Sequence, residues 1–328
     1  MSRVAAVFTG GTISMTVDPA KGGNVPSLSG ADILARTPGL DAVADVLPID
    51  RGRTPASHFS FPDLLAIAEL LRETLEDPAI DGAVVVQGTD TIEETAFLWD
   101  LVLDTQKPVI VTGAMRSASE SPYDGPANLR DAVRVAASSE LRGEGVLVVL
   151  AGSIEPADTV VKTHASSLET FRSLDAGPLG RVVRDEVVIH RRRAPRRRVA
   201  TTRAAERVHV ITAHVAMDGT LVDAAMASGA DGFVVAATGA GNTSATLLEA
   251  CQRAMAAGAS VVLASRCPAG AVHDGYAFPG GGATWARAGA ILAGHLSAPK
   301  ARVALALGLG AGLDRPALAA LLADPVFA

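Results

Sequence analysis

Residues 82–95 read GAVVVQGTDTIEET, a stretch that contains a strand, a turn and the start of a helix. The run from Gly82 to Val86 is continuously apolar, as expected for a strand of a parallel sheet that is covered on both faces. Polar residues follow at once, among them Thr89 and Asp90, before helical spacing resumes. In open α/β sheets, ligands bind outside the carboxyl ends of the strands. We therefore expect Thr89 and Asp90 to lie at a binding edge of a buried sheet.

The same alternation of short apolar runs and longer amphipathic stretches extends along the chain, as in strand–helix–strand units. The expected strands are Val4–Phe8, Gly82–Val86, Pro108–Thr112, Gly145–Leu150, Val208–Thr212, Gly232–Ala236 and Ser260–Ala264. The expected helices are Pro62–Leu75, Ile92–Leu103, Ala127–Ala137 and Ser244–Ala256. A length of 328 residues favours about two domains. The predicted fold class is α/β, with a larger N-terminal parallel-sheet domain and a smaller C-terminal α/β domain.

The segment from Arg181 to Arg203 differs from the rest and reads RVVRDEVVIHRRRAPRRRVATTR. It contains a polar strand pair followed by arginines around Pro195, which we expect to be a solvated linker or a basic surface patch. A nucleic-acid interface is the alternative, but no aromatic side chains are interleaved for stacking. We place the domain boundary here. Residues 1–190 form the N-terminal domain with the candidate catalytic residues, residues 191–204 the linker and residues 205–328 the C-terminal domain.

Composition restricts the partners and the compartment. The chain is 48% hydrophobic with a net charge of −6, which favours a globular protein and disfavours nucleic acid as the main partner. Cys251 and Cys267 are its two cysteines, too few for a disulfide scaffold or a cysteine-rich metal cluster. The first residues, MSRVAAVFTGG, lack the apolar core of a signal peptide, and no apolar run reaches the ~18 residues of a membrane span. We expect a cytoplasmic protein that binds neither membrane nor nucleic acid.

A second turn of interest lies in residues 7–16, VFTGGTISMT. A dinucleotide-binding turn needs G-x-G-x-x-G and a P-loop needs G-x-x-x-x-G-K-[ST], and this stretch contains neither pattern. Phosphate binding is therefore a minor interpretation. Thr12 remains, behind two glycines that let the backbone bend sharply and a substrate approach. A threonine here could also simply cap a helix or turn, so both interpretations stay open.

A threonine hydroxyl is a weak nucleophile until a base takes its proton. None of the seven histidines stands beside an obvious hydroxyl or acid motif, so a lysine is the candidate base. Lys162 lies in ADTVVKTHASSLETFRS among small, β-branched and hydroxyl side chains, and a surface lysine is the alternative. Thr91 or Asp90 could be a helix N-cap, with Glu94 completing a capping box. That explanation accounts for Thr91 and leaves Thr89 and Asp90 without a role.

Taken together, these residues resemble the bacterial L-asparaginase/glutaminase family, two-domain amidohydrolases with a threonine nucleophile. The similarity extends over most of the chain. It is carried by TGGTI at 9–13, GTDTIEETAFLWDL at 88–101, KPVIVTGAMR at 107–116, DGPANL at 124–129, VKTHASSLETFRS at 161–173, GPLG at 177–180, SRCPAG at 265–270 and PKARVALALGL at 299–309. Any one motif is a weak signal, whereas two such threonine motifs together with the lysine segment are specific.

The resemblance implies an L-asparaginase, which hydrolyses the side-chain amide of L-asparagine to L-aspartate and ammonia through a threonine acyl-enzyme intermediate, without a metal or organic cofactor. It also implies a homotetramer or homodimer with active sites at subunit interfaces. The implied catalytic residues are Thr12, Thr89, Asp90 and Lys162, with the backbone N–H groups of Gly11 and Thr89 as the oxyanion hole. The implied substrate-binding residues are Ser57, His58, Ala114 and Asn242, the last supplied by a neighbouring subunit.

Three positions depart from the family pattern. The tyrosine that the family places on the loop after the first strand falls near Asn24 or Val25 in this chain. His58 stands where the family commonly has glutamine, which leaves the choice between asparagine and glutamine open. The glutamate that neighbouring subunits supply has no clear counterpart, and Asp274 or Tyr276 is a hypothetical substitute. The alternatives are a glutaminase-asparaginase of broader specificity and a non-catalytic amino-acid-binding member of the fold.

Overall fold

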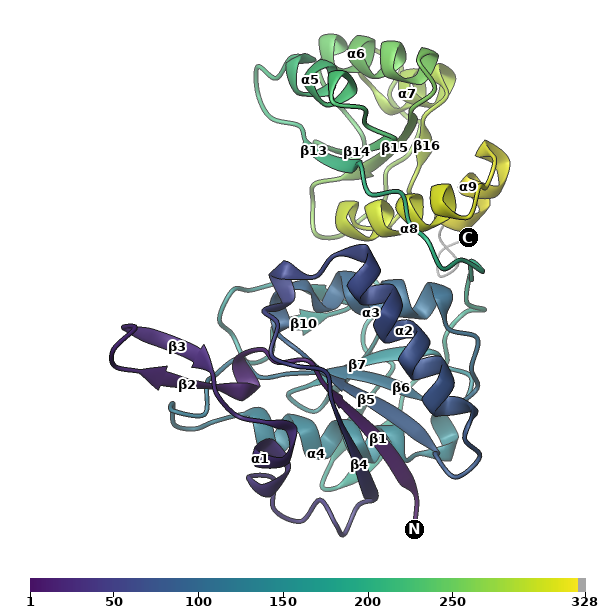
Figure 1. Ribbon diagram of the computed structural model, residues 1–328. Helices are drawn as coiled ribbons and strands as arrows, with labels where there is room; N and C mark the ends of the chain where they lie inside the picture. The colour runs from purple at the N-terminus through teal and green to yellow at the C-terminus, as the bar shows by residue number, and fades with distance from the viewer. Residues whose placement is uncertain (324–328) are drawn as a thin grey trace. The chain divides into compact units, whose positions relative to one another are not determined.

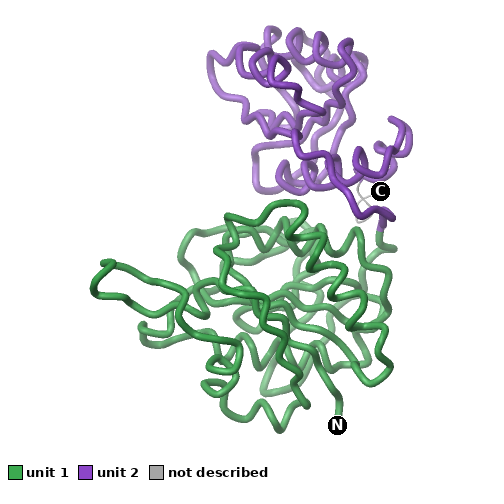
Figure 2. Tube along the Cα trace, viewed as in Figure 1, with its two compact units in different colours: residues 1–196 green, residues 197–328 purple. Residues whose placement is uncertain are grey.

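The computed structural model describes residues 1–323, and the chain divides into two compact units, Met1–Arg196 and Arg197–Ala328 (Figure 2). Each unit contains its own sheet and its own apolar core. The predicted fold class, a larger N-terminal and a smaller C-terminal α/β domain, is confirmed. The division follows Arg196, which belongs to the segment expected as a linker.

A mixed sheet forms the centre of the first unit, in the order β12-β11-β8-β7-β6-β5-β1-β4 (Figure 1). Strands from β4 to β7 pair in parallel, whereas the pairs from β7 to β12 are antiparallel. The strands are β1 (Arg3–Phe8), β4 (Asp45–Asp50), β5 (Gly82–Val86), β6 (Val109–Thr112), β7 (Val146–Leu150), β8 (Ser153–Pro156), β11 (Gly180–Val183) and β12 (Glu186–Ile189).

Helices cover both faces of this sheet, which is why its strands β1, β5, β6 and β7 are buried and apolar (Figure 1). The helices α2 (Phe61–Glu76) and α3 (Ile92–Val102) lie on one face, and α1 (Gly30–Ala35) and α4 (Gly125–Ala136) lie on the other. Ser60 starts α2 with a capping box, because its side chain and that of Asp63 each accept the other's backbone N–H.

Smaller elements complete the first unit. The hairpin of β2 (Met15–Asp18) and β3 (Gly23–Pro26) extends away from the sheet, and β9 (Val161–Lys162) pairs with β10 (Phe171–Arg172) (Figure 1). The 3-10 helices are η1 (Thr12–Ser14), η2 (Ala56–His58), η3 (Thr89–Thr91) and η4 (Ser139–Leu141). Of these, η1 comes shortly after β1 and η3 shortly after β5, so both begin at strand ends.

The second unit is a smaller sheet of parallel strands in the order β13-β14-β15-β16. Its strands are β13 (Val208–Thr212), β14 (Gly232–Ala237), β15 (Ser260–Ser265) and β16 (Ile291–Leu292). The helices α5 (Thr220–Ala227) and α6 (Ala245–Ala256) cover one face, α8 (Ala298–Gly310) and α9 (Arg315–Leu322) the other, and α7 (Gly282–Ala288) precedes β16 (Figure 1). Trp285 and Phe233 are fully buried in its core.

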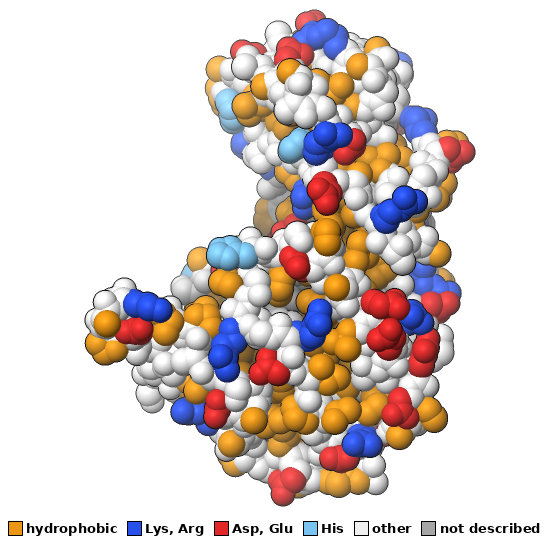
Figure 3. Space-filling view, in the orientation of Figure 1, with side chains coloured by type: hydrophobic (Ala, Val, Ile, Leu, Met, Phe, Trp, Pro, Cys, Tyr) orange, Lys and Arg blue, Asp and Glu red, His pale blue; other side chains and the backbone are white. Residues whose placement is uncertain are grey.

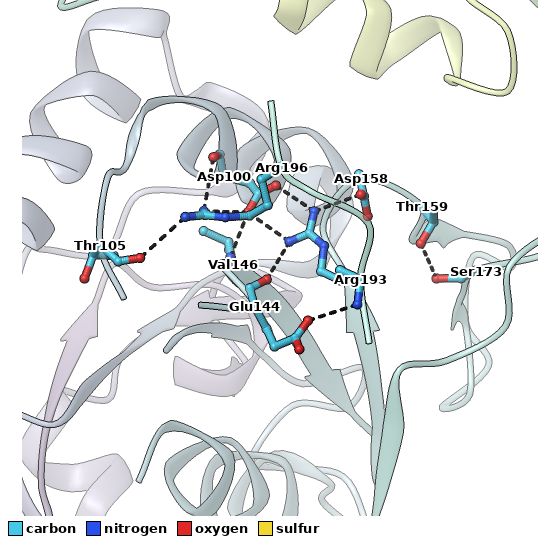
Figure 4. Close-up of polar contacts among 9 residues, drawn as sticks. All are labelled: Asp100, Thr105, Glu144, Val146, Asp158, Thr159, Ser173, Arg193 and Arg196. Carbon is cyan, nitrogen blue, oxygen red and sulfur yellow. Dashed lines mark hydrogen bonds and ion pairs between the residues drawn. The ribbon is translucent and has the colours of Figure 1, made fainter. Parts of the chain in front are cut away.

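The expectation of a solvated arginine segment is wrong for Arg193, whose side chain is only 3% exposed. Its guanidinium forms ion pairs of 2.8 Å with both Asp100 and Asp158 and donates to the Glu144 carbonyl at 2.7 Å (Figure 4). Arg196 pairs with the same Asp100 at 3.2 Å. We call Asp100, Asp158, Arg193 and Arg196 the arginine cluster. Composition alone does not separate an arginine in solvent from one that faces a buried carboxylate.

Candidate active site

The turns that follow β1 and β5 are in contact, because these strands are parallel neighbours. Gly10 and Gly11 have φ angles of +112° and +88°, a region that glycine enters without a steric penalty. A Cβ on Gly11 would lie 2.2 Å from the backbone nitrogen of Gly88. Glycine is therefore required for this close approach. The approach brings together the two turns that carry Thr12 and Thr89.

The turn after β6 joins the same edge. A Cβ on Gly113 would lie 2.4 Å from the Gln87 carbonyl oxygen and 3.2 Å from Cγ2 of Thr89. Ala114, the next residue, is completely buried. The turns after three neighbouring strands, β1, β5 and β6, thus lie against one another, with Thr89 in the middle turn.

Lys162 reaches the middle turn from β9. Its side-chain nitrogen donates to Thr89 Oγ1 at 3.0 Å and forms an ion pair with Asp90 at 2.6 Å. The Lys162 side chain is 11% exposed and that of Asp90 is 77% exposed. The lysine side chain is therefore mostly buried at the edge of the sheet, whereas the carboxylate faces solvent. The backbone N–H of Lys162 donates to the Glu93 carboxylate at 3.2 Å, a contact the sequence did not predict. Lys162 is therefore not a solvated surface lysine. We call Thr89, Asp90 and Lys162 the lysine cluster.

Helix capping does not explain the two threonines for which it was considered. Thr12 is the first residue of η1, whose N-cap is Gly11, and Thr91 is the N-cap of α3; within residues 1–323 neither side chain makes a capping hydrogen bond. The Thr91 hydroxyl instead donates to the Ala56 carbonyl at 3.2 Å. Thr91 thus occupies the N-cap position considered for it, but the capping box with Glu94 is not formed.

Ser57 and His58 lie in η2, beside the middle turn. A Cβ on Gly88 would lie 3.1 Å from the Cβ of Ala56, and the hydrogen bond from Thr91 to Ala56 adds a second link between η2 and η3. Both Ser57 and His58 are exposed. They are therefore available to a ligand at the edge where the lysine cluster lies.

Asn242 belongs to the second unit, where it follows β14 in a turn closed by two backbone hydrogen bonds with Thr238, of 3.0 and 2.9 Å. Its side-chain oxygen Oδ1 is buried and has no hydrogen-bond partner among residues 1–323. The hypothetical substitutes for the glutamate, Asp274 and Tyr276, are in the same unit, where the Tyr276 ring stacks on His273 with 5.7 Å between ring centroids. Asn242, Asp274 and Tyr276 thus belong to the second unit, whereas the other predicted site residues belong to the first.

Two polar residues that the sequence left without a role hold the turn of Ala114. The Asp124 carboxylate accepts the backbone N–H groups of the two residues after Ala114, at 3.0 and 2.9 Å. Nδ2 of Asn128 donates to the Gly113 carbonyl at 3.0 Å. Both residues belong to the DGPANL motif. The signal was an aspartate at a helix start, a residue that commonly binds backbone N–H groups nearby.

Comparison with known proteins assigns the family. Residues 3–195 match the family described as "Asparaginase, N-terminal", and residues 207–322 match the "Glutaminase/Asparaginase C-terminal domain". The chain belongs to the asparaginase family. Each half of the match corresponds to one of the two units of this asparaginase-family chain.

Relatives of similar sequence align over nearly the whole chain, and a solved structure has a similar fold. A probable L-asparaginase from Deinococcus radiodurans is 36% identical, with 100% of this chain and 99% of the relative covered. An L-asparaginase from Bacillus licheniformis is 31% identical, with 93% and 94% covered. The crystal structure of a probable cytoplasmic L-asparaginase from Campylobacter jejuni matches with a TM-score of 0.89 and 28% identity, covering 98% of this chain and 99% of that one.

The surface and the metal-ligand residues give three further observations. On the face drawn in Figure 3, lysines and arginines are interspersed with aspartates and glutamates. No helix in the described part of the chain is long and apolar enough to cross a membrane. Among residues 1–323, no three His, Cys, Asp or Glu side chains are grouped as a metal site would require.

Proposed function

We propose that this asparaginase-family protein is an L-asparaginase that hydrolyses the side-chain amide of L-asparagine through an acyl-enzyme on Thr12. The observation that carries the proposal is the lysine cluster, with Lys162 2.6 Å from Asp90 and 3.0 Å from Thr89, at the turn that contacts Gly11. A nucleophilic hydroxyl needs a neighbouring group that takes its proton, and this cluster offers one.

The reaction has two halves. In the first, Thr12 Oγ1 attacks the amide carbon, its proton passes to the lysine cluster, and a proton from the cluster reaches the amide nitrogen, so that the C–N bond breaks and ammonia leaves. In the second, water attacks the ester on Thr12 and gives up a proton to the cluster. The ester bond breaks, L-aspartate is released and Thr12 regains its hydrogen. General-base assistance of this kind contributes about 10²–10⁴ in rate.

The oxyanion that forms at each attack is proposed to bind the backbone N–H groups of Gly11 and Thr89. Gly11 is the N-cap of η1 and Thr89 is the first residue of η3. N–H groups at helix starts have no acceptor within the helix, so they remain available to a developing negative charge. One such donor is worth about 10²–10³ in rate.

Substrate selection is proposed to use residues around the same edge, of which Ser57, His58 and Asp90 are exposed. Ser57 binds the α-carboxylate, Asp90 binds the α-amino group with His58 beside it, and the Ala114 carbonyl receives the leaving amide nitrogen. Asn242 is supplied by a neighbouring subunit of a homotetramer or homodimer, and the enzyme is cytoplasmic.

Ammonia release from L-asparagine tests the proposal. Thr12→Val keeps the shape of the side chain and removes the hydroxyl, so turnover is expected to fall by more than about 10³-fold. Thr74→Val is the matched control, because the Thr74 hydroxyl donates to the Leu70 carbonyl at 2.7 Å within α2, away from the strand ends. Retained turnover in Thr12→Val would exclude Thr12 as the nucleophile.

The same assay with L-glutamine separates the second candidate, a glutaminase-asparaginase of broader specificity. His58 keeps this candidate open, because an exposed imidazole in η2, beside the middle turn, stands where the family commonly has glutamine. Comparable ammonia release from both amino acids would support the broader specificity. Release from neither, with binding retained, would support a non-catalytic member of the fold.

A further inference from the structure

The Tyr123 hydroxyl donates to the backbone carbonyl of Ile13 at 2.6 Å, across a separation of 110 residues. Ile13 is the residue after Thr12 and the central residue of η1. The bond therefore fixes the backbone of the 3-10 turn that begins with Thr12. Neither the capping interpretation nor the family motifs assigned a role to this tyrosine.

Tyr123 is itself held in place. Its ring packs against the core that includes Phe8 and lies against Gly125, where a Cβ would approach the Tyr123 hydroxyl to 2.4 Å. Burial and the neighbouring Asp124 carboxylate raise the pKa of the Tyr123 phenol. The hydroxyl consequently keeps its proton and stays a donor across the neutral pH range.

The loop that carries Tyr123 makes two further bonds with the same stretch of chain. The Ala118 N–H donates to the Met15 carbonyl at 3.0 Å, and the Val17 N–H donates to Ser119 Oγ at 3.0 Å. Residues 13, 15 and 17 are thus all bonded to the loop 118–123. This loop continues the turn of Ala114, so it links the first strand end to the third.

We propose that Tyr123 is a positioning residue for Thr12: its hydrogen bond to Ile13 sets the η1 backbone and thereby the direction of the Thr12 hydroxyl. The proposal rests on Thr12 being the nucleophile of the proposed function. A hydroxyl displaced by about 1 Å from its line of attack can lose about 10²-fold in rate, whereas binding of a substrate held by other residues changes little. The effect is therefore expected in kcat and not in KM.

Tyr123→Phe removes the hydroxyl and keeps the ring, so the fold is retained. We expect kcat for L-asparagine to fall about tenfold while KM stays within about twofold. The pH profile of kcat should keep its shape, because no proton-transfer group is lost. Backbone amides of residues 12–17 should exchange with deuterium faster than in the wild type. Thr74→Val, which also loses one bond from a hydroxyl to a backbone carbonyl, is the control for all four measurements.

Several results would overturn the proposal. The first is a kcat in Tyr123→Phe equal to that of Thr74→Val, and the second is a change of shape in the pH profile, which would indicate proton transfer by Tyr123. The third is a loss of activity matched by an equal loss of folded protein. A wild type that releases no ammonia would refute the proposed function separately. Unchanged deuterium exchange at residues 12–17 would refute the ordering by Tyr123 whether or not the protein is active.

Discussion

A buried guanidinium is tolerated in a protein interior only while carboxylates pair with it, and Arg193 meets this condition. It contacts Asp100, at the end of α3, and Asp158, four residues before Lys162 (Figure 4). The ion pairs therefore hold the segment that supplies the lysine cluster against the helix that follows η3. Without Arg193, each of the two carboxylates would lose an ion pair while remaining largely buried, although Asp100 would keep Arg196 and the Val146 N–H.

Arg193→Met keeps much of the side-chain length and removes the charge. We expect the free energy of unfolding to fall by about 3–5 kcal/mol at neutral pH, because two buried carboxylates each lose an ion pair, and breaking a buried pair is strongly destabilising. Urea denaturation measures the change. Arg72→Met is the control, since Arg72 pairs with Glu76 on the exposed surface of α2, where such pairs contribute little. Equal effects of the two substitutions would contradict the role assigned to the arginine cluster.

The difference in the free energy of unfolding between wild type and Arg193→Met depends on pH if lost charge causes it, and not if lost packing does. Burial alone would raise the pKa of the Asp100 carboxyl, but Arg193 and Arg196 lower it below its usual 3.8. A lowered folded-state pKa stabilises the protein above the unfolded-state pKa, and that stability is lost as the pH falls through the folded-state value. Wild type therefore keeps this contribution down to about pH 4. In Arg193→Met the largest of the interactions that lower the pKa of Asp100 is lost, so this pKa rises relative to wild type. The folded variant therefore takes up a proton at a higher pH on acidification, and the difference in the free energy of unfolding from wild type narrows. A difference in the free energy of unfolding that does not change with pH would indicate lost packing.

At the scale of elements, the turn after β1 depends on backbone approach. Gly11→Ala would force an L-residue into a conformation with φ +88° and ψ −178° that is essentially restricted to glycine, at about 1–3 kcal/mol. It would also add a Cβ 2.2 Å from the backbone of the next turn, which has no flexible side chain to move away. We expect a loss of about 3 kcal/mol or more in stability and the loss of ammonia release. Gly39→Ala is the control for a positive φ without a steric clash, because φ there is +75° and nothing lies within 4 Å of a Cβ. Equal losses in both variants would show that contact between the turns is not required.

The elements predicted correctly from the sequence are those whose local pattern of apolar and polar residues matches the burial that the fold gives them. The strand Gly82–Val86 has the predicted bounds, because a continuous apolar run between polar turns has no other stable place than a covered sheet. By contrast, β4, DVLPID, was missed. It contains Pro48 and two aspartates, which disfavour a central strand. An edge strand tolerates these residues, and β4 lies at the edge of the sheet. Edge position follows from pairing between distant segments, which local pattern does not contain.

Because local sequence pattern does not contain contacts between distant segments, some site residues were predicted and others were missed. Thr89 and Asp90 follow a strand end, so the geometry of a parallel sheet places them at the common edge. The contact of Tyr123 with Ile13 and that of Glu93 with Lys162 depend on loop conformation and on separations of 110 and 69 residues. For Arg193 the prediction was wrong, because its burial depends on an ion pair with Asp100 that the composition of the arginine segment does not reveal.

At the scale of the whole molecule, the residues proposed for catalysis and substrate binding come from the sequence of both units. Thr12 and the lysine cluster belong to the first unit, and Asn242 belongs to the second. The Asn242 amide oxygen is buried and has no hydrogen-bond partner among residues 1–323, and such a group costs free energy until it is paired. A partner outside its own unit would satisfy this oxygen. The proposal that Asn242 serves a neighbouring subunit therefore predicts an exchange of function between chains.

Complementation between two inactive variants tests this exchange. Thr12→Val alone and Asn242→Ala alone are each expected to release little ammonia. When the two are unfolded together and refolded as a mixture, about one quarter of the sites would combine an intact Thr12 with an intact Asn242 from another chain. Activity of about one quarter of wild type is then expected, provided that each symmetric interface exchanges residues between subunits. If Asn242 acted within its own chain, every site in the mixture would carry one defect. The mixture would then be no more active than its components, even though mixed oligomers, detected by two different affinity tags, had formed.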